Sequence, residues 1–68
     1  MEKVRVVIRD LDSIEVENIL DENGMVDYEW IYGCNEDGNQ YILSYEDNED
    51  LGNALELLYN AGADVEGI

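Results

Sequence analysis

The sequence predicts a small α+β protein, with a three-stranded antiparallel-type sheet and two helices in the order β-α-β-β-α. Three stretches alternate apolar and polar residues with the period of two that half-buried strands show. Two others carry capping residues followed by apolar residues at the helical period. Since 68 residues allow only one hydrophobic core, residues 1–68 are expected to form a single domain.

The first strand is predicted from Lys3 to Arg9. Alternation places three apolar and three basic residues on opposite faces, with Val4, Val6 and Ile8 on one and Lys3, Arg5 and Arg9 on the other. Opposite charges on neighbouring strands stabilise a sheet, so Asp27 and Glu29 on the following strand are the expected partners of these cations. Pairing of the first strand with the third strand stays open as the alternative.

The first helix is predicted from Ser13 to Glu22. Asp12 is the expected N-cap, Glu15 the capping-box acid, and Asn23-Gly24 the C-terminal stop. Such a helix would bury three apolar residues, Val16, Ile19 and Leu20. A strand over Ser13 to Ile19 is the alternative, because the apolar residues there also alternate with acids.

A hairpin follows, formed by strands from Met25 to Tyr32 and from Gln40 to Tyr45. Its turn spans Asn35 to Gly38, where glycine can take the positive φ that such a loop needs. The faces predicted to point inward carry Val26, Tyr28, Trp30 and Tyr32 on one strand and Tyr41, Leu43 and Tyr45 on the other. Packing in the core is favoured over base stacking for Tyr28, Trp30 and Tyr41, since stacking sites need a cationic groove.

The second helix is predicted from a cap at Asp47 or Asn48 to about Asn60. Its apolar stripe consists of Leu51, Ala54, Leu55 and Leu58. Gly52 weakens a helix, which suggests close packing at that position. The tail from Ala63 to Ile68 is expected to be loosely held.

The charge of the chain is strongly one-sided. Eighteen Asp and Glu face three Lys and Arg, which gives a net charge of −15, and all three cations precede Asp10. Such a surface repels nucleic acid and anionic membranes and attracts basic proteins. Solvation at high salt concentration is the alternative reason for this composition.

Catalytic and metal sites are not indicated. The chain contains no His, a lone Cys34 and no glycine-rich phosphate loop, so we expect no enzyme activity and no cofactor. Asn35, Asp37, Asn39 and Glu46 have the spacing of calcium-loop ligands, but Gln40 stands where that loop requires glycine. With no signal peptide and no long apolar run, the expected location is the cytoplasm.

The run Asn35-Glu36-Asp37-Gly38-Asn39-Gln40-Tyr41, continued by Ser44 and by Asn48-Glu49, resembles the hairpin segment of small acidic type II-A anti-CRISPR proteins. Members of that family are compact α+β inhibitors of Cas9. The resemblance implies that acidic and amide side chains of the hairpin occupy the surface by which Cas9 reads the protospacer-adjacent motif (PAM). It rests on Asp37, Gly38, Asn39 and Glu49, while Gln40 replaces an acid of the family.

Charge and resemblance together predict a DNA-mimicking anti-CRISPR inhibitor of phage or prophage type that blocks the DNA (PAM)-binding surface of a Cas effector. Cas9 is the first expected target and a multi-subunit surveillance complex the second. An acidic adaptor or immunity-type protein that binds another basic protein is the alternative. The predicted contact set consists of Glu36, Asp37, Asn39, Gln40, Glu46, Asp47, Glu49 and Asp50.

Overall fold

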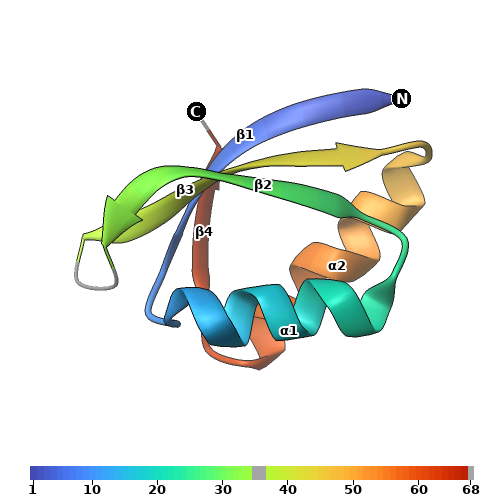
Figure 1. The fold of residues 1–68 in the computed structure, drawn as a ribbon. Coiled ribbons are helices and arrows are strands. Elements are labelled where there is room, and N and C mark those ends of the chain that lie inside the picture. The colour runs from blue at the N-terminus through green and yellow to red at the C-terminus, as the bar shows by residue number, and fades with distance from the viewer. Residues whose placement is uncertain (35–36, 68) are drawn as a thin grey trace.

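Two helices cover one face of a four-stranded antiparallel sheet (Figure 1). The computed structural model describes residues 1–34 and 37–67, with Cys34 described by its backbone alone. The elements in chain order are β1 (Glu2–Arg9), α1 (Ser13–Asn23), β2 (Asp27–Cys34), β3 (Gly38–Tyr45), α2 (Asn48–Asn60) and β4 (Asp64–Gly67). The α+β class, both helices and the first three strands are therefore as predicted.

The expectation of three strands and a loosely held tail was wrong. Residues Asp64–Gly67 form β4, which pairs with β1 from Arg9↔Asp64 to Val6↔Gly67. Only Val65 in this strand is apolar, so four residues gave too little alternation to reveal it. The sheet order is β2-β3-β1-β4, which is the split β-α-β arrangement with β1 and β3 in the centre.

The expected pairing of the first strand with Asp27 and Glu29 was also wrong. The neighbour of β1 is β3, with Lys3↔Ser44 and Arg5↔Ile42 in register. Asp27 and Glu29 pair with the same two residues from the other side, so they share the rows of the cations but lie one strand further away. The buried apolar residues of β1 and β3 explain this order, because the central strands of a sheet face the middle of the core.

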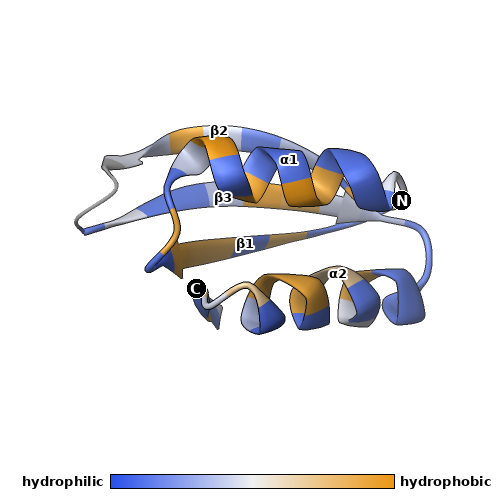
Figure 2. Cartoon of the chain, turned by 90° about the horizontal axis from the view of Figure 1, so that it is seen from below, coloured by the Kyte–Doolittle hydropathy of each residue, from blue (hydrophilic) through white to orange (hydrophobic). Residues whose placement is uncertain are grey.

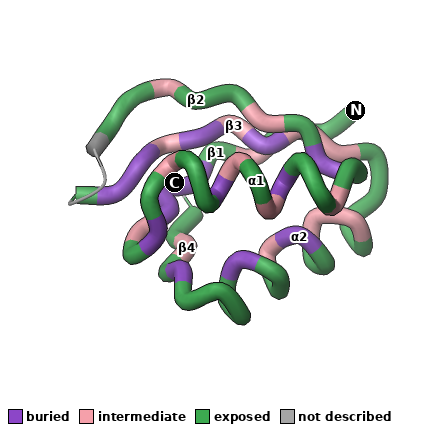
Figure 3. The backbone as a smooth tube through the Cα atoms, turned by 60° about the horizontal axis from the view of Figure 1, so that its bottom comes forward, coloured by how far each residue is buried: buried purple, intermediate pink, exposed green. Residues whose placement is uncertain are grey.

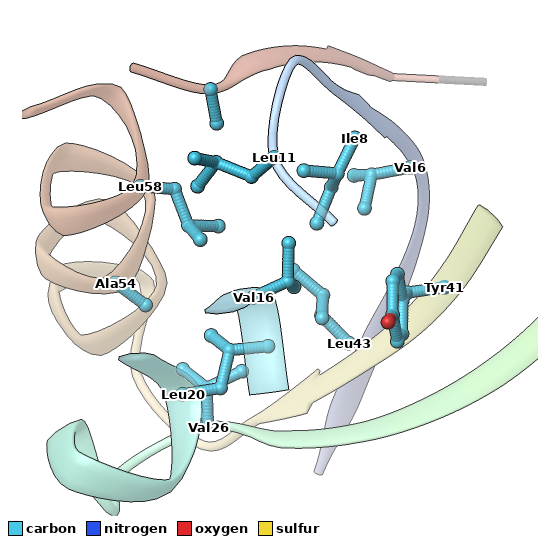
Figure 4. Close-up of a cluster of buried hydrophobic side chains, with 11 residues drawn as sticks. Val6, Ile8, Leu11, Val16, Leu20, Val26, Tyr41, Leu43, Ala54 and Leu58 are labelled. Atoms are coloured by element: carbon cyan, nitrogen blue, oxygen red, sulfur yellow. The ribbon is translucent and has the colours of Figure 1, made fainter. Parts of the chain in front are cut away.

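The core lies between the sheet and the helices (Figure 4). Side chains from β1, β3 and both helices meet there, and those with no exposed surface include Ile8, Val16, Tyr41, Leu43, Ala54 and Leu58. Hydrophobic residues recur along α1 and α2 (Figure 2), and those of the core are buried between the helices and the sheet. Buried segments of both layers are marked in Figure 3. Periodicity in the sequence thus predicted the inward faces of β1, β3 and the helices.

Capping residues set the helix boundaries. The Asp12 carboxylate accepts a hydrogen bond from the Glu15 backbone N–H at 3.1 Å, and Gly24 ends α1 with φ 72°. Asp47 caps α2 by accepting from the Glu49 backbone N–H at 3.0 Å. These contacts confirm the helix over Ser13–Glu22, one residue longer than expected, and exclude the alternative strand.

A β-bulge between Trp30 and Tyr32 changes the face to which β2 directs its last side chains. Trp30 pairs with Tyr41, whereas Tyr32 pairs with Gln40, which lies on the opposite face of β3. One extra residue in a strand reverses the alternation beyond it. The prediction that Tyr32 shares a face with Trp30 was therefore wrong.

Two tyrosine hydroxyls of the sheet donate hydrogen bonds to carboxylates of α1. Tyr41 donates to a Glu17 carboxylate oxygen at 3.2 Å, and Tyr28 donates to Asp21 at 2.9 Å. Their rings meet edge to face with centroids 6.2 Å apart. Burial, together with the charge and hydrogen bond of Glu17, raises the pKa of Tyr41, and the hydrogen bond to Asp21 raises the pKa of Tyr28.

Gly52→Ala is expected to stabilise the protein, contrary to the close packing predicted at this site. A Cβ atom at Gly52 would meet nothing within 4 Å, so alanine adds helix propensity without a clash. The expected gain is about 0.5–1 kcal/mol in the free energy of unfolding, measured by urea denaturation. Gly62→Ala is the matched control: it is equally unobstructed, but φ of 103° makes it destabilising. A loss of stability in Gly52→Ala would contradict this.

Tyr41→Phe is expected to lower stability near pH 8 by about 0.5–1.5 kcal/mol, because a hydrogen bond to a carboxylate is lost. Above pH of about 10 the unfolded chain ionises Tyr41 while the folded chain, with its raised pKa, keeps the proton, so wild-type stability falls. The Tyr41→Phe variant has no hydroxyl at this position, so its stability does not fall for this reason. Urea unfolding from pH 8 to 11.5 should therefore show the two stability curves converging, and parallel curves would refute the assignment.

Candidate partner-binding surfaces

Charge is distributed unevenly between the two faces of the molecule. All three cations, Lys3, Arg5 and Arg9, lie on β1, on the face of the sheet that the helices leave open. The helices and their caps contain no cation. We call them the helical layer, and their acids are Asp12, Glu15, Glu17, Asp21, Glu22, Asp47, Glu49, Asp50 and Glu56.

The structure divides the predicted contact set between two ends of the molecule. Asp37 lies at the β2–β3 hairpin, whereas Glu46, Asp47, Glu49 and Asp50 lie beyond the other end of β3 (Figure 1). A strand of this length separates its ends by roughly 23 Å. The prediction that these residues cluster was therefore wrong, because closeness in the sequence was taken for closeness in space.

At the hairpin end, only part of the set is available to a partner. Asp37 is exposed, while Glu36 lies outside the described residues. Asn39 is only 3% exposed and accepts a hydrogen bond from the Trp30 indole at 3.1 Å. The interpretation of Asn39 as an imitation of a base edge is thus wrong, since its side chain is a buried part of the fold.

The open face of the sheet carries a chain of hydrogen bonds across three strands. The Arg5 guanidinium donates to the Gln40 amide oxygen at 3.0 and 3.2 Å, and the Gln40 amide nitrogen donates to the Tyr32 hydroxyl oxygen at 2.7 Å. Gln40, predicted as a contact residue, instead links β1 to β2. Its amide is therefore already engaged on this face.

The tail acids belong to the same open face. Arg9 donates to a Glu66 carboxylate oxygen at 2.9 Å and lies 4.0 Å from Asp64. These ion pairs are partly exposed and so contribute little stability on their own. Together they bring opposite charges to the β4 side of the open face, where Arg9 is balanced by neighbouring carboxylates.

The strongest concentration of carboxylates lies at the end where β3 leads into α2. We call this region the acidic end, and its members are Asp21, Glu22, Asp27, Glu46, Asp47, Glu49 and Asp50. A shallow hollow of about 220 Å³ joins its segments, with Gly24, Asp27, Glu46 and Asp50 in its lining. Half of the predicted contact set belongs here, and Asp21, Glu22 and Asp27 were missed.

These three acids could have been found from the predicted elements alone, because the hairpin sets Asp27 opposite Ser44 near the end of β3, and Asp21 and Glu22 lie in the helix that ends just before β2. In the split β-α-β arrangement the two helices run antiparallel, so the end of α1 meets the start of α2.

No group of His, Cys, Asp or Glu among the described residues is arranged to hold a metal ion. No helix within the described ranges is long and apolar enough to cross a membrane.

Comparison with known proteins adds no relative, since no family model, curated protein or solved structure matches the chain.

Removal of one charge from the end of α1 should be less costly to stability than removal of one charge from the start of α2. Glu22 lies in the last turn of α1 and Glu49 in the first turn of α2, where the helix dipole disfavours and favours an acid respectively. Glu22→Gln should therefore raise the melting temperature relative to Glu49→Gln, by the equivalent of at least about 0.3 kcal/mol. Both variants lose the same charge, so equal melting temperatures would show that bulk repulsion alone acts here.

Proposed function

We propose that this chain is a DNA-mimicking inhibitor that occupies a basic DNA-binding surface of a Cas effector and blocks recognition of target DNA. One observation carries the proposal: the helical layer bears many carboxylates and no cation, while the three cations lie on the opposite face of the sheet. A chain selected only for solubility would intersperse both signs of charge.

The physical basis is competition for the same donors. A DNA-binding cleft places Lys and Arg side chains to meet phosphates, which carry one charge per about 1.7 Å of duplex axis. Carboxylates on helices packed against a sheet accept hydrogen bonds from those cations in fixed positions. Burial of Val16, Leu20, Ala54 and Leu58 holds both helices in place before any partner arrives, so little order must be gained on binding.

The acidic end is the part of this surface that we expect to contribute most. Glu46, Glu49 and Asp50 come from a loop and a helix start, and Asp27 joins them from β2 across the hollow. The resemblance of the hairpin to type II-A anti-CRISPR proteins makes Cas9 the first target to test and its PAM-reading surface the first site. A multi-subunit surveillance complex is the second.

Charge reversal at the two halves of the predicted set tests the proposal. Purified Cas9–guide complex is titrated with the protein, and displacement by a PAM-containing duplex is measured. Glu46→Lys with Glu49→Lys should weaken binding at least tenfold more than Glu36→Lys with Asp37→Lys, because both pairs change the charge equally but only the first lies in the acidic end. Asp47 is left unchanged because it caps α2.

Other outcomes also decide between the candidates. Affinity should fall steeply between about 50 and 500 mM salt, since the screening length for exposed charge pairs shrinks from roughly 14 Å to about 4 Å across that range. Binding that tolerates a saturating PAM duplex would support the acidic adaptor or immunity-type protein instead. A greater loss of affinity in the Glu36→Lys, Asp37→Lys variant would indicate that the hairpin is the contact surface. Equal losses of affinity in both variants would mean that only net charge matters.

A further inference from the structure

One edge of β2 has no neighbouring strand within the part of the chain that the structure describes. Among the described residues β2 pairs only with β3, so it forms one border of the sheet (Figure 1). Alternate residues of such a strand direct their N–H and C=O groups away from the sheet. β4, at the other border, has four residues against eight in β2. The β2 edge is therefore the longer template for an added strand.

Half-exposed aromatic rings flank this edge on both faces of the sheet. Trp30 is 49% exposed on the side of the helices, and Tyr32 is 54% exposed on the open side, where the bulge directs it. The Trp30 indole donates to Asn39, and the Tyr32 hydroxyl accepts from Gln40. These bonds position both rings in the absence of a ligand. A bound strand would thus find two apolar surfaces with little ordering cost.

Charge decides what kind of strand fits. Asp27 and Glu29 are exposed on the open side of β2. A second copy of the chain paired along this edge would bring its own Asp27 and Glu29 to one face of the joined sheet, and like charges on adjacent strands are unfavourable. A strand with Lys or Arg at every second residue would instead place cations beside Asp27 and Glu29. Its intervening apolar side chains would lie on the side of Trp30.

We propose that the β2 edge binds an extended basic segment of the partner protein by β-strand addition. Main-chain hydrogen bonds to β2 would supply affinity, and the acids and aromatic rings beside them would supply selectivity. The inference rests on the proposed function, because its occupant belongs to a basic partner. It adds a mode of binding along the β2 edge, a surface that shares only Asp27 with the acidic end.

The test uses an eight-residue peptide of alternating Lys and Val, with blocked ends, and the full chain. A second peptide has the same sequence and charge but carries N-methyl groups at its four central amides, which removes donors from both of its edges. Trp30 is the only tryptophan, so its fluorescence reports binding at the edge. The unmodified peptide should shift Trp30 emission to shorter wavelength and bind at least tenfold more tightly than the methylated one.

Hydrogen exchange gives a second readout, in which amides of β2 should exchange at least tenfold more slowly with the unmodified peptide bound. Glu29→Lys should weaken that peptide severalfold more than Glu56→Lys on α2, an equal charge change away from the edge. Equal affinity for the two peptides, or unchanged exchange in β2, would overturn strand addition. Neither result would touch the competition between the acidic end and DNA, which the Cas9 assay measures separately.

Discussion

Central placement of β1 is the constraint on which the rest of the molecule depends. Its inward side chains, Val6 and Ile8, are buried in the core, and its outward face carries Val7 and all three cations of the chain. β3 and β4 pair with its two edges. Each helix connects two strands that are not neighbours, so the β1-α1-β2 unit passes over β3 and the β3-α2-β4 unit passes over β1. A single strand therefore both completes the core and confines positive charge to one face of the sheet.

That arrangement explains how so acidic a chain can form a compact domain. Carboxylates lie on helix exteriors, at caps and loops and on the outward rows of strands, where water solvates them and their mutual repulsion is screened. Asp12 and Asp47 accept backbone hydrogen bonds at helix starts, and Glu17 and Asp21 accept bonds from tyrosine hydroxyls. Several acids thus contribute directly to the fold, and those that make no such contact are the ones most free to meet a partner.

Local patterns in the sequence were sufficient for elements with clear periodicity or caps. Both helices, the inward residues of β1 and β3 and the class of the fold could be predicted, because each depends on neighbours a few positions away. β4, the bulge before Tyr32 and the partner of Arg9 depend on contacts between distant segments. The candidate surface failed for the same reason: Asp37 and Glu49 are close in the sequence, but a whole strand separates them in space.

The pairing of β1 with β4 also has a consequence for the order of folding. Arg9 and Asp64 lie far apart in the sequence, so β1 cannot pair with β4 until the chain has been synthesised beyond Asp64. Until then a nascent chain exposes the second edge of β1, a central strand of the sheet. Such long-range pairing slows folding and prolongs the life of aggregation-prone intermediates. The high negative charge of the chain counters this risk, since unfinished copies repel one another during synthesis.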